Sequence, residues 1–325
     1  MTTGKRQSAA DSLGAPHRSI EADDPRERFT LELFDALWSR YRERVSYVQQ
    51  YEQLVQESGA TFVNDHIAFR TFGCQRPNVG IHTLSRIFEA LGYQAAGCYR
   101  FVQTHLGSIH FQHPNPMFPK LFITELKTWE LSPGARKIIA RAIRDHREPL
   151  ENEALAALSS FTDQSATKRA RLLRQLVNQF HQLPWKVPAK RDIEALAGES
   201  QFAAWVLVHG YNVNHFTALI NSHGAGPLSN IEKTSKALAA AGVPMKGTIE
   251  GEPKSKLRQT ATEAVMIDVN VRSGTKPTTM PWTYAYFELA ERGLVRDPEG
   301  SGRARFEGFL GPQATQLFEM TRVKS

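Results

Sequence analysis

The chain has 325 residues, of which 41% are hydrophobic and 22% are charged, and its net charge is +7. This composition suits a globular protein with a full core, and no apolar run approaches the roughly 18 residues of a membrane-spanning helix. The two cysteines, Cys74 and Cys98, are too few for a disulfide scaffold, so we expect reduced thiols in a cytoplasmic protein.

The first 27 residues differ in composition from the rest of the chain. Residues 1–27 are rich in Ser, Ala, Gly and charged side chains and lack the apolar stretch of a secretory signal, which predicts a disordered tail. Within residues 28–58, the apolar side chains lie three and four residues apart. This spacing predicts one or two amphipathic helices that end at Gly59.

A strand follows the helices and carries an unusual set of side chains. The segment 63–73 reads VNDHIAFRTFG. Alternation along a strand puts Ile67 and Phe69 on one face and His66 and Arg70 on the other. The sequence therefore predicts a strand with one apolar face and one face that carries an imidazole and a guanidinium.

The next elements complete a first unit and lead into a helical region. A helix is predicted within 76–97 and two or three strands within 98–131. Residues 132–205 change character, with helices expected at about 132–145 and 166–181. We interpret 132–205 as a helical insertion.

The insertion holds nearly all of the basic excess of the chain. Residues 131–192 contain twelve Lys or Arg against six Asp or Glu. No nucleic-acid motif accompanies this charge, so we interpret it as a solvated helical face and do not expect a nucleic-acid partner.

The order of elements then repeats. A strand is predicted at 213–222 (VNHFTALINS), a helix at 229–247, and strands at 257–269 and 281–293. Like the first unit, this second one opens with a strand that bears a histidine on its less apolar face.

The repeat defines the expected fold. We predict an α+β protein of paired β-α-β-β-β units that form a curved mixed sheet around a central metal site. The first unit, with the N-terminal helices, spans 28–131. The second unit, with the C-terminal segment, spans 206–325.

Equivalent histidines in two repeated units suggest a metal centre. His66 and His215 would point into a cleft between the units, where imidazole nitrogen is a common metal ligand. Glu288, on the last strand of the second unit, is the expected carboxylate ligand, and its counterpart in the first unit is Glu125. Two histidines and one carboxylate are typical of non-haem Fe(II) oxygenases, although zinc hydrolases also use this set.

Two arginines are candidate anion ligands. Arg70 shares a strand face with His66, and a guanidinium binds a carboxylate through two hydrogen bonds. A salt bridge from Arg70 to Asp65 or Glu125 is the structural alternative. Arg258 would face the cleft by alternation, and a single β-bulge would put Gln259 there instead.

Four stretches, DHIAFRTFG (65–73), NVNHFTALI (212–220), LRQTATEA (257–264) and YAYFELAERG (284–293), resemble one known family. This is the 2-oxoadipate dioxygenase/decarboxylase family, also called hydroxyglutarate synthase, of the vicinal oxygen chelate superfamily. The resemblance runs from about residue 30 to the C-terminus.

The resemblance implies an Fe(II) enzyme that needs no separate 2-oxoglutarate. Family members convert 2-oxoadipate and O2 to (R)-2-hydroxyglutarate and CO2 in lysine breakdown. By motif, His66, His215 and Glu288 would bind the iron, and Arg70 would bind the substrate, a small 2-oxo dicarboxylate. Zinc, nickel or manganese could replace iron in purified protein.

Two alternatives stay open at this point. One is another metal enzyme on the same scaffold, such as a glyoxalase-like isomerase that recruits Glu125 as a fourth ligand, or a ring-cleaving dioxygenase. The other is a non-enzymatic module that binds partners through the basic insertion.

Overall fold

The computed structural model describes residues 14–148, 150–161, 165–224, 226–297, 300, 302–311 and 321. The predicted disordered tail is wrong for residues 14–27, while residues 1–13 lie outside the described part. Pro16–Ser19 form a 3-10 helix, and the helix α2 begins at Pro25. His17 is buried because its ring contacts Asp35 and Asn64, so a polar residue anchors this segment where composition gave no signal.

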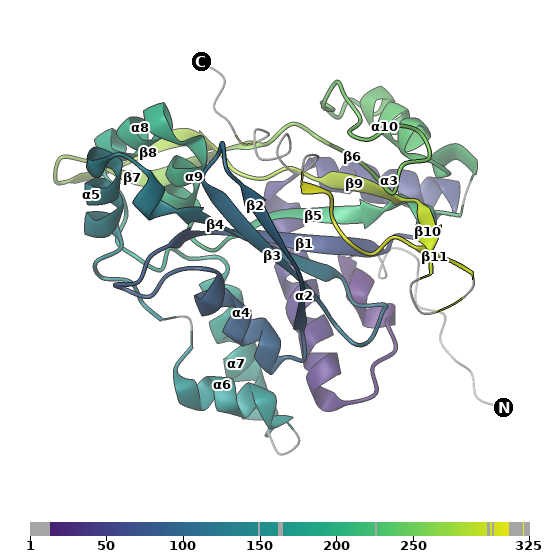
Figure 1. The fold of residues 1–325 in the computed structure, drawn as a ribbon, viewed down its shortest axis with the longest axis horizontal. Helices are drawn as coiled ribbons and strands as arrows, with labels where there is room; N and C mark the ends of the chain where they lie inside the picture. The colour runs from purple at the N-terminus through teal and green to yellow at the C-terminus, as the bar shows by residue number, and fades with distance from the viewer. Residues whose placement is uncertain are drawn as a thin grey trace.

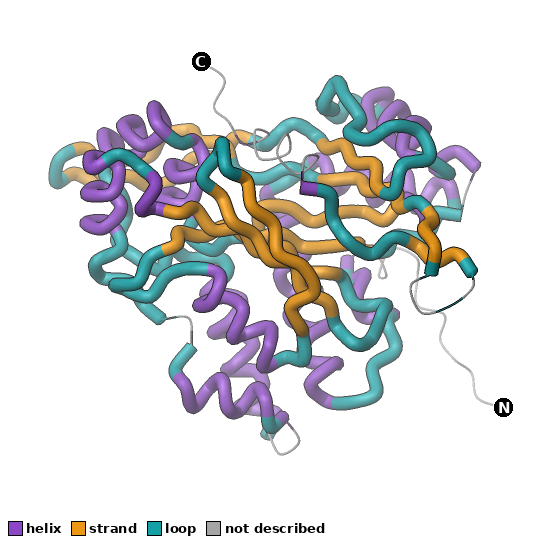
Figure 2. The backbone as a smooth tube through the Cα atoms, viewed as in Figure 1, coloured by secondary structure: helices purple, strands orange, loops and turns teal. Residues whose placement is uncertain are grey.

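Helices surround a central sheet on several sides (Figures 1 and 2). The predicted helical region 28–58 forms two helices, and Gly59, with a positive φ of 66°, ends the second as expected. Toward the bottom of Figure 1 lie α4, α6 and α7, while α3 and α10 lie at the upper right. The bounds are α2 Pro25–Arg44, α3 Tyr47–Ser58, α4 Ile81–Ala90, α5 Pro133–Ala142, α6 Asn152–Ser159, α7 Ala166–Gln179, α8 Lys190–Glu199, α9 Gln201–His209 and α10 Ile231–Ala240.

In the described part of the chain, the central sheet has seven strands in the order β2-β3-β4-β1-β5-β9-β6. It is mixed, because β1 is parallel to β4 and antiparallel to β5, while β5 is parallel to β9. The strands are β1 Asn64–Gly73, β2 Gln94–Phe101, β3 Leu106–Gln112, β4 Lys120–Lys127, β5 Val213–Leu219, β6 Leu257–Ala261 and β9 Glu288–Arg292. Two hairpins stand apart from it: β7 Met266–Ser273 with β8 Lys276–Thr283, and β10 Leu294–Arg296 with β11 Arg303–Arg305.

The two predicted units meet where their opening strands pair. β1, α4, β2, β3 and β4 form the first unit, and β5, α10, β6 and β9 contribute the second unit to the same sheet. β1 and β5 pair antiparallel at the centre, which relates the units by an approximate twofold axis (Figure 1). The expected mixed sheet of repeated units is confirmed.

The strands predicted at 257–269 and 281–293 are both interrupted. β6 ends at Ala261, β8 ends at Thr283 and β9 begins only at Glu288. The carbonyls of Tyr284 and Tyr286 accept hydrogen bonds from the side chains of Trp205 and Tyr41 instead of from a neighbouring strand. Tertiary contacts therefore break a segment whose local pattern favours a continuous strand.

Both faces of β1 are buried, in different surroundings. Ile67 and Phe69 belong to the main apolar cluster, which also contains Leu172 and Trp205 of the 132–205 segment. Ala68 belongs to a small second cluster with Phe122, Leu257, Ala290 and Phe309. The main apolar cluster contains residues of the first unit, of the 132–205 segment and of the second unit. Since the three segments share this core, it does not mark borders between them, and the borders proposed at 131 and 205 remain a prediction.

No helix in the described part of the chain is both long and apolar enough to cross a membrane.

Candidate metal centre

Two β-bulges shape the ladder that carries the histidines. His66 pairs with Thr217 and Ala68 pairs with His215, but the register shifts on either side of this stretch. The register leaves Asp65 as the extra residue on β1 and Asn214 as the extra residue on β5. A bulge re-aims a side chain, so the residue before each histidine can turn toward the imidazole that follows it.

Each imidazole is held by the residue that precedes it. Asp65 Oδ2 lies 2.8 Å from His66 Nδ1, and Asn214 Oδ1 lies 3.0 Å from His215 Nδ1. Both oxygens are acceptors, so each histidine keeps its proton on Nδ1 and turns an unprotonated Nε2 toward the other ring. Burial lowers the pKa of both histidines, which favours the neutral form that binds metals.

Three ligand atoms converge between β1, β5 and β9. The two Nε2 atoms lie 3.4 Å apart, His66 Nε2 lies 3.5 Å from Glu288 Oε1, and His215 Nε2 lies 3.4 Å from Glu288 Oε2. Atoms that each lie about 2.1 Å from one ion cannot be more than about 4.2 Å apart, and these separations meet that limit. In the described part of the chain, His66, His215 and Glu288 form the one group of three such side chains close enough to hold a metal ion.

The surroundings of the Glu288 carboxylate favour a bound cation. Its side chain is fully buried, and burial raises the pKa of Glu288 to about 8, although a hydrogen bond from Gln259 opposes the rise. Gln259 Nε2 donates to Oε1, while Oε2 has no hydrogen-bond partner among the described residues. Burying a carboxylate oxygen without a hydrogen-bond donor costs free energy, and a metal ion bound to that oxygen would remove this cost. The two imidazoles and the carboxylate therefore fit a bound metal ion.

Arg70 lies in the same cavity. Its side chain is 2% exposed, its guanidinium lies 5.0 Å from the ring of Phe202 and 5.1 Å from that of Trp205, and Nη1 donates to Thr321. The two carboxylates suggested as its structural partners are engaged elsewhere: Asp65 pairs with Arg292, and Glu125 accepts a hydrogen bond from the backbone of Ile81.

The prediction that Arg258 faces the cleft is wrong. Arg258 forms ion pairs with Glu232 of α10 and Glu291 of β9, and Gln259 lines the cavity instead. Leu257 packs in the small apolar cluster beside the site and not under the helix. Alternation along β6 therefore puts Gln259 on the face of the site and Arg258 on the opposite face.

Glu125 does not join the metal ligands. Its carboxylate accepts from the first residue of α4, Ile81, at 2.9 Å, which is a cap on a helix terminus. The prediction that Glu125 is the counterpart of Glu288 is wrong. Ala68 pairs with Phe122 in the first unit, and Thr217, which follows its histidine at the same distance, pairs with Glu288 in the second. Phe122 therefore occupies the position equivalent to Glu288.

The cavity at the triad is small and closed on one side by an aromatic ring. It measures about 30 Å³, and its walls include Ala68, Phe122, Tyr286 and Phe309. The Phe309 ring lies 4.9 Å from the His66 ring. Sequence patterns gave no signal for Phe309, because it follows the last strand in an irregular segment.

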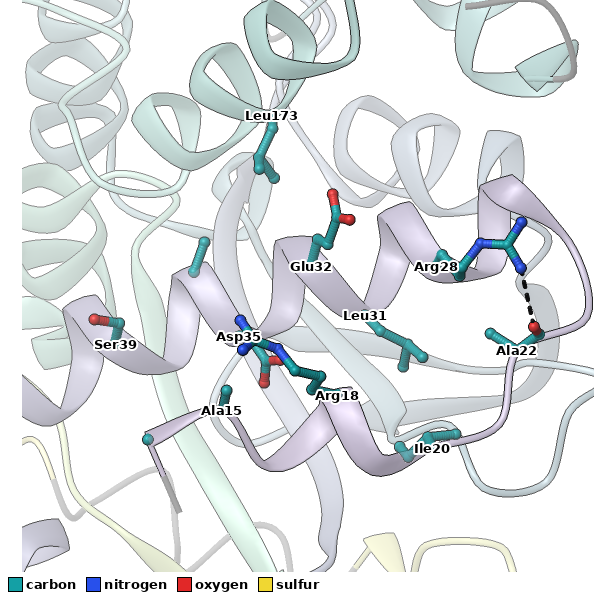
Figure 3. Close-up of a pocket in the computed structure, with 12 residues that line it drawn as sticks. Ala15, Arg18, Ile20, Ala22, Arg28, Leu31, Glu32, Asp35, Ser39 and Leu173 are labelled. Carbon is teal, nitrogen blue, oxygen red and sulfur yellow. Dashed lines mark hydrogen bonds between the residues drawn. The ribbon is translucent and has the colours of Figure 1, made fainter. Parts of the chain in front are cut away.

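A larger hollow elsewhere lacks such chemistry. It encloses about 730 Å³ between the 3-10 helix Pro16–Ser19 and α2, and its charged side chains are Arg18, Arg28, Glu32 and Asp35 (Figure 3). None of its lining residues belongs to the triad. Size alone therefore does not identify the functional site.

Residues 33–322 match the family model of 2-oxoadipate dioxygenase/decarboxylase. The chain belongs to this family. It is 29% identical over 278 residues to the 2-oxoadipate dioxygenase/decarboxylase of Oryza sativa subsp. japonica, an alignment that covers 79% of this chain and 68% of the relative. The chloroplastic protein of the same description from Arabidopsis thaliana is 28% identical over 281 residues, which cover 79% of this chain and 67% of the relative.

Solved structures show the same fold. The hydroxyglutarate synthase of Oryza sativa, crystallised with 2-oxoadipate, superposes with a TM-score of 0.72 at 24% identity, covering 93% of this chain and 98% of that one. A glyoxalase superfamily protein from Ralstonia eutropha JMP134 gives a TM-score of 0.77 at 22% identity, covering 94% and 99%. The predicted α+β fold with a mixed sheet of repeated units is thereby confirmed.

Proposed function

We propose that this protein is a non-haem Fe(II)-dependent dioxygenase/decarboxylase that converts 2-oxoadipate and O2 to (R)-2-hydroxyglutarate and CO2. The observation that carries the proposal is the meeting of His66, His215 and Glu288 with Arg70 in one small cavity of a chain from this family. Both oxygen atoms of O2 are accounted for: one enters the new carboxylate and the other the hydroxyl group.

The ligand set is consistent with iron. Two imidazoles and one carboxylate leave coordination positions open for substrate and O2, the arrangement of non-haem Fe(II) oxygenases. Bound there, Fe(II) would supply the activation of O2 that no side chain can provide. Zinc, nickel or manganese would compete for the same nitrogen and oxygen donors.

The side chains around the triad have separate roles in this proposal. Arg70 binds the carboxylate far from the reacting end of the diacid, because a buried guanidinium strongly favours an anionic partner. Ala68 leaves space beside His66 for the chain of the substrate. Phe122 and Phe309 exclude water from the reacting carbon.

The small diacid and O2 are the proposed partners, and lysine catabolism is the proposed setting. We retain a cytoplasmic location as a prediction. The engagement of Glu125 with α4 argues against a glyoxalase-like site with a second carboxylate ligand.

Oxygen uptake tests the proposal directly. The protein is freed of metal, reconstituted with Fe(II) without air, and mixed with O2 and 2-oxo diacids of five, six and seven carbons. We expect 2-oxoadipate to give the fastest O2 uptake, with 2-hydroxyglutarate and CO2 formed in equal amounts. A protein loaded with Fe(II) that consumes O2 no faster with any of these acids would contradict the proposal, and full activity of His66→Ala would contradict the site.

A further inference from the structure

Asn214 is the extra residue of the bulge on β5, and it lines the cavity at the triad. It is 1% exposed, and its Oδ1 lies 3.0 Å from His215 Nδ1. Its Nδ2 is buried and has no hydrogen-bond partner among the described residues. A buried amide donor without an acceptor is unfavourable, which points to a ligand that supplies the acceptor.

The orientation of this amide follows from the histidine. If Nε2 of His215 faces the metal site, Nδ1 carries the proton and needs an acceptor. Oδ1 of Asn214 is that acceptor. The NH2 group is therefore the part of the amide that does not contact His215. The free donor is therefore a consequence of the ligand geometry.

The repeat supplies a comparison on the other strand. Asp65 occupies the equivalent bulge before His66, but both of its oxygens also accept from Arg292, at 2.6 and 2.7 Å. The first unit thus closes its side of the site with an ion pair. The second unit leaves an uncharged donor free at the matching position.

Arg70 belongs to the same side as Asn214. The ring of Tyr286 packs 4.7 Å from that of His215, and Tyr286 lines the cavity together with Arg70 and Asn214. An elongated diacid that reaches Arg70 with one end would bring its other end past His215.

We infer that Asn214 donates a hydrogen bond from Nδ2 to an oxygen of the 2-oxo acid head group, while its Oδ1 positions His215. The inference rests on the proposed function and deepens it: the substrate lies on the β5 side of the metal site, between Asn214 and Arg70. At the matching position of the first unit, the Asp65 carboxylate accepts from Arg292 and has no donor to offer.

Asn214→Asp separates the two roles, because it keeps an acceptor for His215 and replaces the donor with a negative oxygen. Asn214→Ala removes both. Affinity for Co(II) is measured by competition with a chelator, and affinity for 2-oxoadipate by calorimetry of the metal-loaded protein without O2. The matched control is Asn212→Asp, the same change at a buried asparagine outside the cavity lining, where Oδ1 contacts Arg44.

We expect Asn214→Asp to keep Co(II) affinity within about threefold of wild type and to weaken 2-oxoadipate binding at least tenfold. Asn214→Ala should weaken Co(II) binding by about 10-fold or more and, at saturating metal, weaken diacid binding as well. Asn212→Asp should change neither affinity.

Wild-type affinity for the diacid in a folded Asn214→Asp, or in Asn214→Ala at saturating metal, would overturn the inference and leave the proposed function standing. Failure of the metal-loaded wild type to bind any 2-oxo diacid would overturn both. Whether the metal-loaded wild type binds a 2-oxo diacid therefore distinguishes failure of the proposed function from failure of this inference.

Discussion

Arg292 and Asp65 form a buried ion pair directly behind one of the candidate metal ligands. Nε and Nη2 of Arg292 donate to the two carboxylate oxygens at 2.6 and 2.7 Å, and Oδ2 of Asp65 also lies 2.8 Å from His66 Nδ1. Although burial alone would raise the pKa of Asp65, the charge and hydrogen bonds of Arg292 hold it well below its usual range. Asp65 is therefore a permanent anion that fixes the ring of His66.

Removing this anion should weaken the metal site. In Asp65→Asn, the amide can still accept from His66, but the charge that supports the imidazole is lost and Arg292 is left buried without its partner. We expect metal affinity to fall roughly 10- to 100-fold and the free energy of unfolding to fall by about 3–5 kcal/mol. Chelator competition measures the first change and urea denaturation the second.

The Arg42–Glu52 pair provides a control for stability. Glu52 is 5% exposed and accepts from Arg42 through both oxygens, yet it lies on α3 and outside the cavity lining. Glu52→Gln should destabilise the protein without changing its affinity for metal. Equal metal affinity in Asp65→Asn and the wild type would show that Asp65 has only a structural role.

Glu288 should cost stability when no metal is bound. Its buried Oε2 has no donor among the described residues, and burial raises the pKa of the group to about 8. We expect Glu288→Gln to lose metal binding while the metal-free protein at pH 7 unfolds at the same temperature as wild type or higher. Metal content after dialysis and thermal unfolding of the metal-free proteins measure the two effects.

Glu125, the carboxylate that the sequence predicts as the counterpart of Glu288, should behave in the opposite way. Glu125→Ala removes the acceptor for the Ile81 backbone N–H at the start of α4. We expect it to retain metal and to lose about 1 kcal/mol of stability, as for other lost helix caps. Loss of metal from Glu125→Ala would favour a site with a second carboxylate ligand.

Alternation along single strands is enough to predict that His66, Arg70 and His215 face the site, but it does not predict that Asn214 does. His66 and Arg70 were placed on one face of β1 because a strand has period two, and the observed burial of Ile67 and Phe69 in the main core agrees. The pairing of the two histidines, 149 residues apart, rested on the repeat. These features depend on local spacing or on the internal repeat, so they can be predicted from a single sequence.

The features that depend on pairing between strands could not be predicted in this way. The bulges at Asp65 and Asn214 exist only in the register of β1 against β5. The side occupied by Arg258 depends on where Leu257 packs after β6 joins β9. His17 anchors the N-terminal segment through Asp35 and Asn64, contacts that composition does not encode.

Arg70 should decide between diacids and monoacids. In Arg70→Gln, we expect 2-oxoadipate to bind roughly 10- to 100-fold more weakly, the loss of a charged hydrogen bond, while 2-oxohexanoate, which lacks the far carboxylate, is little affected. The KM values for O2 uptake measure this. Arg258→Gln is the control, because Arg258 pairs with Glu232 and Glu291 and should not alter either value. An equal loss for both acids would exclude recognition of the far carboxylate.

Phe309 should control entry to the cavity. A cavity of about 30 Å³ has room for about one water molecule, so a six-carbon diacid requires a wall to move. Phe309 lies outside the central sheet, and its segment is held by Arg292 Nη1 to the carbonyls of Phe306 and Gly308. We expect Phe309→Ala to speed diacid association several-fold in stopped-flow measurements without O2. An unchanged rate would place the entrance at another wall.

Acid should destabilise the protein through its buried histidines. Burial lowers the pKa of His209 to about 3, although a hydrogen bond to the Thr283 carbonyl opposes this, whereas an unfolded histidine titrates near 6.5. The unfolded chain therefore binds a proton between pH 6.5 and about 3 that the folded chain does not. The stability contributed by neutral His209 is fully present above pH 6.5 and falls by up to about 1.4 kcal/mol per pH unit below it.

Replacing His209 should reduce this sensitivity to acid. The pKa values of His146 and His181 are also lowered by burial, to about 4, so the wild type should lose stability steeply below pH 6. His209→Asn will be less stable than wild type at pH 7 because it loses packing around Trp205, but its dependence on pH should be shallower by about one proton. Urea denaturation at pH 7, 6, 5 and 4 compares the slopes. Parallel curves for the two proteins would mean that His209 takes up its proton in the folded state as readily as in the unfolded chain.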